Sequence, residues 1–208
     1  MSNPQSTDPT YVVVDRKSRL DLIYRKYRRD PAFTKLRNPF PNQRERNFVP
    51  GEGNECPLVM FVGEAPGAVE NAKKRPFVGT AGHELDNWLV HGQLSRMDCW
   101  ITNVVKYQPP RNRTPFQTER DASKWYLAAE VTILQPPVIA LLGNVALRTV
   151  FGDELSIGDC HGRVMERKGR AYVPLWHPMA VIYDPDKRQS ALDDIMALMT
   201  EVVRRMNS

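Results

Sequence analysis

The sequence predicts an α/β protein with a three-layer α/β/α architecture around a central, mainly parallel four-stranded sheet. Short apolar runs alternate with longer segments of helical periodicity, which indicates parallel strands joined by helices. Several apolar runs are continuously hydrophobic, as expected of strands that are buried on both faces. A length of 208 residues suits one hydrophobic core, so residues 1–208 are expected to form a single domain.

The N-terminal part of the chain precedes this alternation. Residues 1–10 are polar and are expected to be disordered. Within the segment 16–29, Leu20, Ile23 and Tyr24 recur at helical spacing, which predicts an amphipathic helix with a basic outer face. Prolines, glycines and asparagines then predict an irregular stretch. Residues 16–50 are therefore expected to be a basic N-terminal helix and its connection to the sheet.

The elements of the sheet and its helices follow in order. Strands are expected at 57–63, 99–105 and 138–143, and in a hairpin or strand pair at 164–175. Helices are expected at 81–91, 116–134, 144–151 and 189–206. The first strand stops at a glycine, as buried strands commonly do. In the first of these helices Leu85, Trp88 and Leu89 share one face, which predicts that this face covers the sheet.

Charge is the compositional feature that bears most on a partner. The chain has a net charge of +5 and a pI of about 9.2, which favours nucleic acid as a ligand. Basic side chains are concentrated near the N-terminus, at Arg16, Lys17, Arg19, Arg25, Lys26, Arg28, Arg29, Lys35, Arg37, Arg44 and Arg46. Such a surface could contact phosphates. A solvated basic helix without a ligand is the alternative.

The sequence lacks signals for membrane insertion, export and metal binding. No apolar stretch reaches the roughly 18 residues of a membrane span, and the polar N-terminus has no apolar signal core. We therefore expect a cytoplasmic protein without a membrane partner. Cys56, Cys99 and Cys160 are odd in number and far apart, so neither a disulfide framework nor a metal site is predicted. Cys56 and Cys99 adjoin apolar runs and are expected to be buried.

The loops after the strands are the expected place for a ligand, because ligands of parallel sheets bind beyond the carboxyl ends of the strands. After the first strand, the turn at 63–67 holds the carboxylate of Glu64 between residues that restrict the backbone. Further on, Phe77 could present its ring to a planar base. A helix N-terminal acid or a turn residue is the alternative for Glu64, and a core aromatic is the alternative for Phe77.

The later strands are followed by an amide and an imidazole. Asn103 carries a donor and an acceptor that suit the N3–H and O4 edge of uracil, although an asparagine can equally cap a turn. His177 stands in a loop before a proline, where it could donate to a leaving group. DNA contacts are expected from basic loop residues and from an apolar pair that could wedge into a base stack. These residues are Lys106, Arg111, Arg113, Val181 and Ile182.

The motifs GEAPG, RPFVG-x-AG, ITNVVK-x-x-PP-x-NR-x-P, ALLG and HP-x-A, in this order, resemble the uracil-DNA glycosylase superfamily, most closely its family four. The resemblance extends over residues 51–183. It implies that Glu64 orients the attacking water and stabilises the cation-like sugar, and that His177 donates to uracil O2 as the base leaves. Phe77 would stack on the base, and Asn103 would read its edge. Further substrate contacts are implied for Gly63, Ala65, Pro66, Gly67 and Asn112.

The chain departs from family four where that family carries four cysteines that ligate an iron–sulfur cluster. Leu36, Pro39, Tyr107 and Ser123 stand at or near these positions. We therefore expect no metal and no cofactor, with apolar and aromatic packing, Tyr107 included, in that structural role. Tyr183 stands where the family has an arginine after HP-x-A, so the DNA contact that the family makes through this loop is not implied for this chain. Covalent trapping of uracil, a property of a related branch, is not expected because the loop after Tyr107 has no histidine.

The resemblance implies the function of a monofunctional uracil-DNA glycosylase. Such an enzyme binds uracil-containing DNA, flips the uracil out, hydrolyses the N-glycosidic bond and leaves an abasic site and free uracil, as in base excision repair. A monomer is the family expectation. Two alternatives stay open: the same scaffold acting on another modified or deaminated base, and a non-catalytic DNA-binding replication accessory protein.

Overall fold

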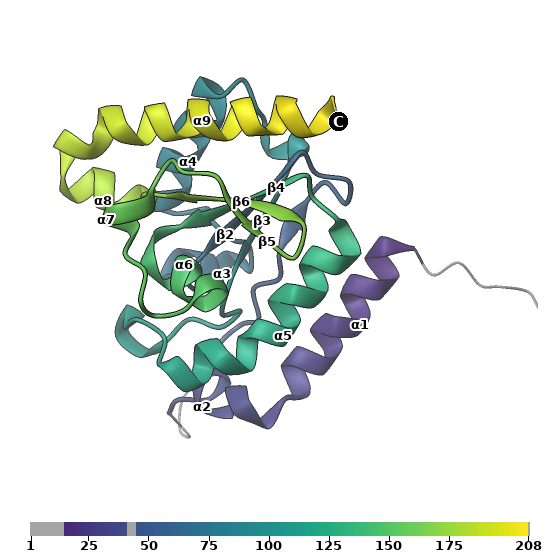
Figure 1. The fold of residues 1–208 in the computed structure, drawn as a ribbon. Coiled ribbons are helices and arrows are strands. Elements are labelled where there is room, and N and C mark those ends of the chain that lie inside the picture. The colour runs from purple at the N-terminus through teal and green to yellow at the C-terminus, as the bar shows by residue number, and fades with distance from the viewer. Residues whose placement is uncertain (1–14, 41–44, 208) are drawn as a thin grey trace, which may run out of the picture.

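A six-stranded sheet forms the centre of the computed structural model, which describes residues 15–40 and 45–207 (Figure 1). The strands are β1 (Glu52–Gly53), β2 (Val59–Gly63), β3 (Cys99–Asn103), β4 (Val138–Leu142), β5 (Met165–Arg167) and β6 (Arg170–Leu175), and their order across the sheet is β1-β3-β2-β4-β6-β5. The four inner strands pair in parallel, which confirms the predicted parallel sheet. Two short antiparallel edge strands enlarge it. Of these, β5 completes the predicted hairpin, whereas β1 lies in a segment predicted to be irregular.

Helices cover both faces of this sheet. One face carries α1 (Arg16–Arg29), α5 (Gln117–Leu134) and α6 (Gly143–Phe151), and the other carries α4 (Thr80–His91), α8 (Pro178–Tyr183) and α9 (Arg188–Met206). Figure 1 shows α1 and α5 side by side, with α9 on the opposite side of the sheet. Successive residues of β2 alternate between the two cores, Met60 and Val62 in one and Val59 and Phe61 in the other. The sheet is therefore buried on both faces, which explains its continuously apolar strands.

Short helices fill the connections. They are α2 (Thr34–Arg37), α3 (Ala68–Lys73) and α7 (Ile157–Cys160), with the 3₁₀ turns η1 (Pro31–Phe33), η2 (Arg96–Asp98), η3 (Pro110–Asn112) and η4 (Pro185–Lys187). The strand predicted to reach residue 105 ends at Asn103. Beyond it, the N–H groups of Val104 and Val105 donate to the carbonyls of Gly63 and Glu64, at 2.9 and 3.1 Å. These bonds tie the loop after β3 to the loop after β2.

An aromatic cluster, formed by Tyr27, Phe33, Phe48, Tyr107 and Tyr126, joins α1 to α5 and to the loop after β3. The ring of Tyr27 stacks on Phe33 with centroids 3.9 Å apart and meets Tyr126 edge-on at 4.8 Å. Tyr107 and Phe48 pack at its side. The Tyr27 ring is fully buried. The basic N-terminal helix therefore belongs to the core of the fold, while its outer face stays exposed.

The two cysteines that were expected to be buried differ in their exposure. Cys99 is buried as expected, but Cys56 is exposed and its sulfur accepts a hydrogen bond from Arg16 Nη1 at 2.9 Å. The expectation of burial for Cys56 was wrong because the chain leaves the sheet edge at this point, ahead of β2. Residues 1–10 lie outside the described residues. Within 15–40 and 45–207, no helix is long and apolar enough to cross a bilayer.

Candidate active site

A cavity of about 600 Å³ opens at the carboxyl ends of the parallel strands. Most of the predicted catalytic and substrate-binding residues line it, namely Glu64, Ala65, Gly67, Phe77, Asn103, Asn112 and His177. They come from the loops after β2, β3 and β6 and from the segment between α3 and α4. The topology of the sheet thus gathers side chains that are far apart in the sequence, at the edge where ligands of such sheets bind.

Gly63 and Pro66 are buried next to this cavity and are not part of its wall. Gly63 is the last residue of β2 and pairs with Asn103 on β3. A Cβ atom at Gly63 would lie 2.4 Å from the ring of Phe77 and 2.5 Å from Asn103 Oδ1. Only glycine, which has no Cβ atom, leaves room for both side chains at this position.

The carboxyl group of Glu64 faces the cavity from the turn after β2. Burial raises its pKa, while a hydrogen bond with the Thr114 side chain and the charge of Arg120 act in the opposite direction. The backbone of Glu64 is fixed by the bond from Val105 N–H to its carbonyl. A carboxylate with a raised pKa is a better proton acceptor than an exposed one, which suits it to orient and activate a water molecule.

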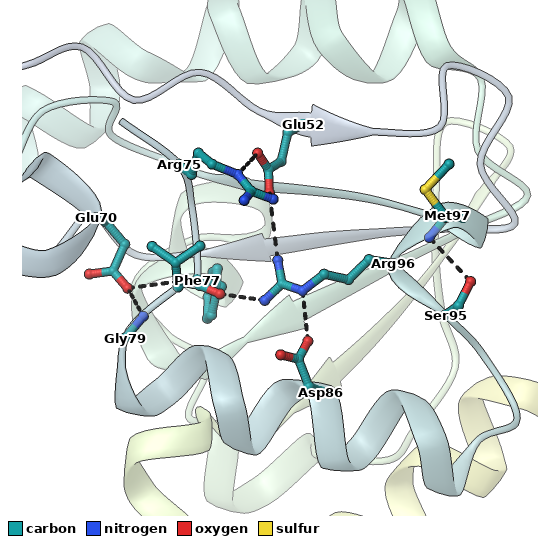
Figure 2. A network of polar contacts seen from close by, with 10 residues as sticks. Glu52, Glu70, Arg75, Phe77, Gly79, Asp86, Ser95, Arg96 and Met97 are labelled. Atoms are coloured by element: carbon teal, nitrogen blue, oxygen red, sulfur yellow. Dashed lines mark hydrogen bonds and ion pairs between the residues drawn. The ribbon is translucent and has the colours of Figure 1, made fainter. Parts of the chain in front are cut away.

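Phe77 occupies the cavity wall in a conformation that is rare for its residue type. Its φ angle is +50°, in the left-handed region, which costs a residue with a side chain about 1–2 kcal/mol. The ring is 5% exposed, and its centroid lies 6.0 Å from that of His177. The side chains of Glu70 and Arg96 form hydrogen bonds with the backbone at Gly79 and Phe77 (Figure 2). The strain therefore coincides with the position that sequence reasoning assigned to base stacking.

The side-chain amide of Asn103 is free for a ligand. Asn103 is only 3% exposed and lies at the end of β3. Its backbone carbonyl accepts from Lys106 Nζ at 2.6 Å, but no described residue forms a hydrogen bond with its side chain. The amide is therefore available to a ligand that offers one acceptor and one donor.

The imidazole of His177 is neutral at physiological pH, because burial lowers its pKa to about 4. His177 caps the first turn of α8, and its Nδ1 accepts from Met179 N–H at 3.2 Å. The proton of the neutral ring therefore resides on Nε2, which becomes a hydrogen-bond donor. Gly143 allows this placement, because a Cβ atom there would lie 3.0 Å from His177 Cβ.

Asn112 reaches the cavity from the loop after β3 and is braced from behind. Its Oδ1 accepts from Gln108 Nε2 at 2.6 Å, and Gln108 Oε1 accepts from Arg46 Nη1 at 2.8 Å. Asn112 has a φ angle of +55°. The relay fixes the amide so that its NH₂ group is left for a ligand or a water molecule.

Two of the residues expected to contact DNA cannot do so. Lys106 is fully buried, and its Nζ pairs with Glu130 Oε1 at 2.8 Å and donates to Thr102 Oγ1. Val181 is also fully buried, because the apolar pair lies in helix α8, where Val181 packs into the core, and not in a loop. Ile182 is half-buried on the same helix and lies outside the cavity lining.

The two arginines of the loop after β3 differ in their availability. Arg111 is exposed on η3, with a φ angle of +56°. Arg113 is half-buried, and its guanidinium forms a two-pronged ion pair with Glu119, at 2.7 and 2.8 Å, above the ring of Phe116. Of these two arginines, Arg111 is therefore the one with a free charge at the surface.

The cavity also contains residues that sequence reasoning missed. These are Ala68, Val69, Glu70, Gly79, Thr80, Ala81 and Met179, and the cavity is also lined by Tyr183, which the sequence had singled out only as a departure from the family motif. Glu70 was detectable in part, because a glutamate at the third position of a helix often accepts from the backbone N–H of the N-cap residue, as Glu70 does from Gly67 at 3.2 Å. Tyr183 is 81% exposed at the rim. Tyr183 is the last residue of α8, and the sequence pattern had not predicted this helix.

The residues present do not fit the iron–sulfur cluster that the resemblance to family four implies. Such a cluster needs thiolate ligands, and in the described part of the chain no three His, Cys, Asp or Glu side chains form a metal-binding group. Leu36 and Tyr107 pack in the same apolar core as the aromatic cluster. Ser123 Oγ lies 3.3 Å from the hydroxyl of Tyr27. Leu36, Tyr107 and Ser123 thus take part in packing and in a hydrogen bond within the fold.

The groups around the cavity match the demands of one kind of reaction. Cleavage of a bond between a sugar and a planar heterocycle creates positive charge on the sugar and negative charge on the base. A carboxylate stabilises the first charge, and a neutral imidazole donor stabilises the second. An aromatic ring and a free amide can hold the face and the edge of the heterocycle. Fold and site together define a hydrolase that acts on N-glycosidic bonds.

Comparison with known proteins identifies the family within that class. The Uracil DNA glycosylase superfamily matches residues 50–199, and the chain belongs to this superfamily. It is 38% identical over 161 residues to a type-4 uracil-DNA glycosylase of Archaeoglobus fulgidus, which covers 74% of this chain and 81% of that protein. A type-4 uracil-DNA glycosylase of Pyrobaculum aerophilum is 41% identical over 158 residues, 72% of this chain and 81% of the relative. A DNA polymerase of Bacillus phage SP01 is 30% identical over 149 residues, 71% of this chain but 16% of the polymerase.

Proposed function

We propose that this chain is a monofunctional uracil-DNA glycosylase that flips uracil out of DNA, hydrolyses the bond between uracil N1 and deoxyribose C1′, and leaves an abasic site. One observation carries the proposal: the free amide of Asn103 and the neutral imidazole of His177 line the same cavity, with the carboxylate of Glu64 beside them. The type-4 relatives support uracil-DNA as the substrate.

Recognition of the base follows from the donors and acceptors of its edge. Uracil presents N3–H as a donor and O4 as an acceptor, which the oxygen and the NH₂ group of Asn103 complement. Cytosine presents an acceptor at N3 and a donor at C4, so an amide held in the uracil-reading orientation would face like groups. Phe77 offers its ring to the face of the base, as stacking platforms do. The base must leave the helix to reach this site, because the cavity encloses its edge and its face.

Bond cleavage is assigned to Glu64 and His177. As the bond between N1 and C1′ breaks, its electron pair leaves with the base, and Nε2–H of His177 donates to uracil O2 to stabilise the anion. The carboxylate of Glu64 stabilises the cationic sugar and accepts a proton from the attacking water, whose oxygen bonds to C1′. Protonation of the anion then gives free uracil, so one water is consumed for each abasic site.

Contacts with the DNA backbone are assigned to exposed basic side chains. Arg111 is exposed on the loop that carries Asn112, and the outer face of α1 is rich in lysine and arginine. Phosphate contacts of this kind weaken as salt is raised. Tyr183, at the rim, replaces the arginine of the family motif and offers a ring in place of a charge. The cytoplasmic location, the monomeric state and the single domain spanning residues 1–208 are proposed on the sequence alone.

The experiment that tests this function uses labelled oligonucleotides that each carry one uracil, thymine, hypoxanthine or xanthine. The strands are incubated with the protein and then treated with alkali, which breaks them at abasic sites. Cleavage at uracil alone is the expected result, and Asn103→Ala should abolish it. Cleavage at another base as well would broaden the substrate class. No cleavage of any strand, with DNA binding retained, would overturn the proposal in favour of a non-catalytic accessory protein.

A further inference from the structure

Arg96 lies outside the cavity but contacts the backbone of the residue assigned to base stacking. It belongs to η2, between α4 and β3, and its Nη2 group donates to the carbonyl of Phe77 (Figure 2). Phe77 holds a left-handed backbone conformation that phenylalanine rarely adopts. A contact at this carbonyl acts directly on the strained peptide, and no part of the proposed chemistry uses Arg96.

The guanidinium of Arg96 is itself fixed from two sides. Nε donates to Asp86 Oδ1 on α4 at 2.7 Å, and Nη1 lies 3.7 Å from Glu52 Oε1 on β1. Glu52 also holds Arg75 through two hydrogen bonds, at 2.8 and 3.0 Å. Figure 2 shows Arg96 between Glu52 and Asp86, with its remaining arm toward Phe77. Nε and Nη2 thus donate to two different partners while Nη1 lies at ion-pair distance from Glu52, an arrangement that the single ammonium group of a lysine cannot reproduce.

The other side of the same peptide segment is held by Glu70. One of its carboxylate oxygens, Oε1, accepts from the N–H groups of Val78 and Gly79, at 3.0 and 2.7 Å. Its second oxygen accepts from Gly67 N–H at 3.2 Å, which links the stacking segment to the turn that carries Glu64. At the helix that follows, a Cβ atom on Gly82 would lie 2.0 Å from the Phe77 carbonyl oxygen, so only glycine fits there.

We propose that Arg96 is a positioning residue that, together with Glu70, holds Phe77 in its left-handed conformation and thereby keeps the ring ready to stack on the flipped base. The inference rests on the proposed function. Without Arg96, the strain of Phe77 favours other backbone conformations, in which the ring leaves the base position. Only the remaining fraction of molecules binds the base well, so the apparent affinity equals the intrinsic affinity multiplied by that fraction. A strain of the usual size for a left-handed residue corresponds to roughly a tenfold loss.

The test compares Arg96→Ala and Arg96→Lys with Arg75→Ala as a matched control. Arg75 binds the same Glu52 but, among the described residues, forms no hydrogen bond with Phe77, and it is mostly exposed. Steady-state cleavage of a uracil oligonucleotide gives KM and kcat for each protein. We expect KM to rise roughly tenfold in Arg96→Ala with kcat within about threefold of wild type. Arg96→Lys should raise KM by a smaller factor, and Arg75→Ala should behave as wild type.

A double-variant comparison shows whether the effect passes through the ring. In a Phe77→Leu background, Arg96→Ala should change KM little, because the platform that it positions is already lost. Equal effects of Arg96→Ala in both backgrounds, or a loss confined to kcat, would overturn the inference. So would wild-type KM in both Arg96 variants. Should Arg96→Ala fail to fold, Arg96→Lys carries the same comparison.

The inference and the proposed function can fail separately. A wild-type protein that releases no uracil would refute the function, whatever the variants do. In that case amide hydrogen exchange at Val78 and Gly79 tests the positioning itself. Faster exchange in Arg96→Lys than in Arg75→Ala would support a role of Arg96 in holding this segment. Equal protection in the two variants would overturn it.

Discussion

Removing one partner of the buried Lys106–Glu130 ion pair should destabilise the fold strongly, whereas removing both should not. Nζ and Oε1 are 2.8 Å apart, and both side chains are at most 1% exposed. Lys106→Met alone leaves the Glu130 carboxylate buried without a cation, which costs about 3–5 kcal/mol of unfolding free energy. Glu130→Leu alone leaves a buried ammonium and should cost a similar amount. Lys106→Met combined with Glu130→Leu should cost only about 1–2 kcal/mol, chiefly from lost hydrogen bonds.

Urea denaturation followed by tryptophan fluorescence measures these free energies in the two single variants and the double variant. Helix α5 offers a matched control, because Lys124 and Asp121 also form an ion pair, at 2.6 Å, with side chains about half exposed. Lys124→Met should cost less than about 1 kcal/mol, since water already solvates both charges. Additive costs of Lys106→Met and Glu130→Leu would refute the reasoning, because a true pair must show strong coupling.

The same Lys106→Met variant decides between a structural role and the DNA contact that its sequence position suggests. A lysine that neutralises one phosphate contributes about 0.9 to the slope of log binding constant against log salt concentration. Lys106 is fully buried, so its replacement should leave that slope unchanged. A slope reduced by about 0.9 would mean that Lys106 reaches the DNA, against the structure.

Three further outcomes are expected. Glu64→Gln should lower kcat roughly a hundredfold or more while DNA binding stays intact. Because burial raises the pKa of Glu64, the wild-type rate should fall on acidification at a pH above the usual value of 4.5, and the variant should not show this fall. Full activity of Glu64→Gln would contradict the assigned role. The lowered pKa of His177, about 4 against an ordinary 6.5, means that the unfolded chain binds this proton more readily. Unfolding free energy should therefore drop by up to roughly 3 kcal/mol between pH 6.5 and 4, and His177→Gln should lose less in urea titrations at the two pH values; parallel losses would count against it. Arg111→Ala should reduce the salt slope of DNA binding by about 0.9 and Tyr183→Arg should raise it by about 0.9, and unchanged slopes would place both residues away from the phosphates.

The fold could be predicted from the sequence where burial and periodicity agree. Helix α1 was predicted at its observed bounds, because its apolar positions face one core and its basic positions face solvent. Strands β2 and β4 were predicted within two residues of their observed bounds, since burial on both faces leaves only apolar residues in them. Strand β1 escaped prediction because two residues carry no periodic signal, and it is defined by its pairing with β3. Cys56 was misjudged because an apolar neighbourhood in the sequence does not fix which residues enter the core.

The site could be predicted where a side chain follows a strand directly. Glu64, Asn103 and His177 all meet at one cavity, as the rule for parallel sheets requires. The wrong predictions concern residues three or four positions after Asn103 and His177. Lys106 and Val181 were expected to face DNA. Lys106 instead forms an ion pair with the buried carboxylate of Glu130 on α5, and Val181 lies on the side of α8 that packs into the core. Glu130 and the core residues around Val181 are far from these positions in the sequence, so no local pattern could reveal either contact.

The aromatic cluster has a consequence for how far the folding unit extends. The family match begins at residue 50, yet Tyr27 and Phe33 lie before it and are fully buried against α5 and the loop after β3. A chain shortened to residues 50–199 would expose Tyr126 and Tyr107 to water and leave the backbone N–H of Lys106 without the Tyr27 hydroxyl that accepts from it at 3.0 Å. The boundary of shared ancestry and the boundary of cooperative folding therefore differ here. An excised homology region should behave as a loosened, aggregation-prone fragment, because the missing helix is part of its core.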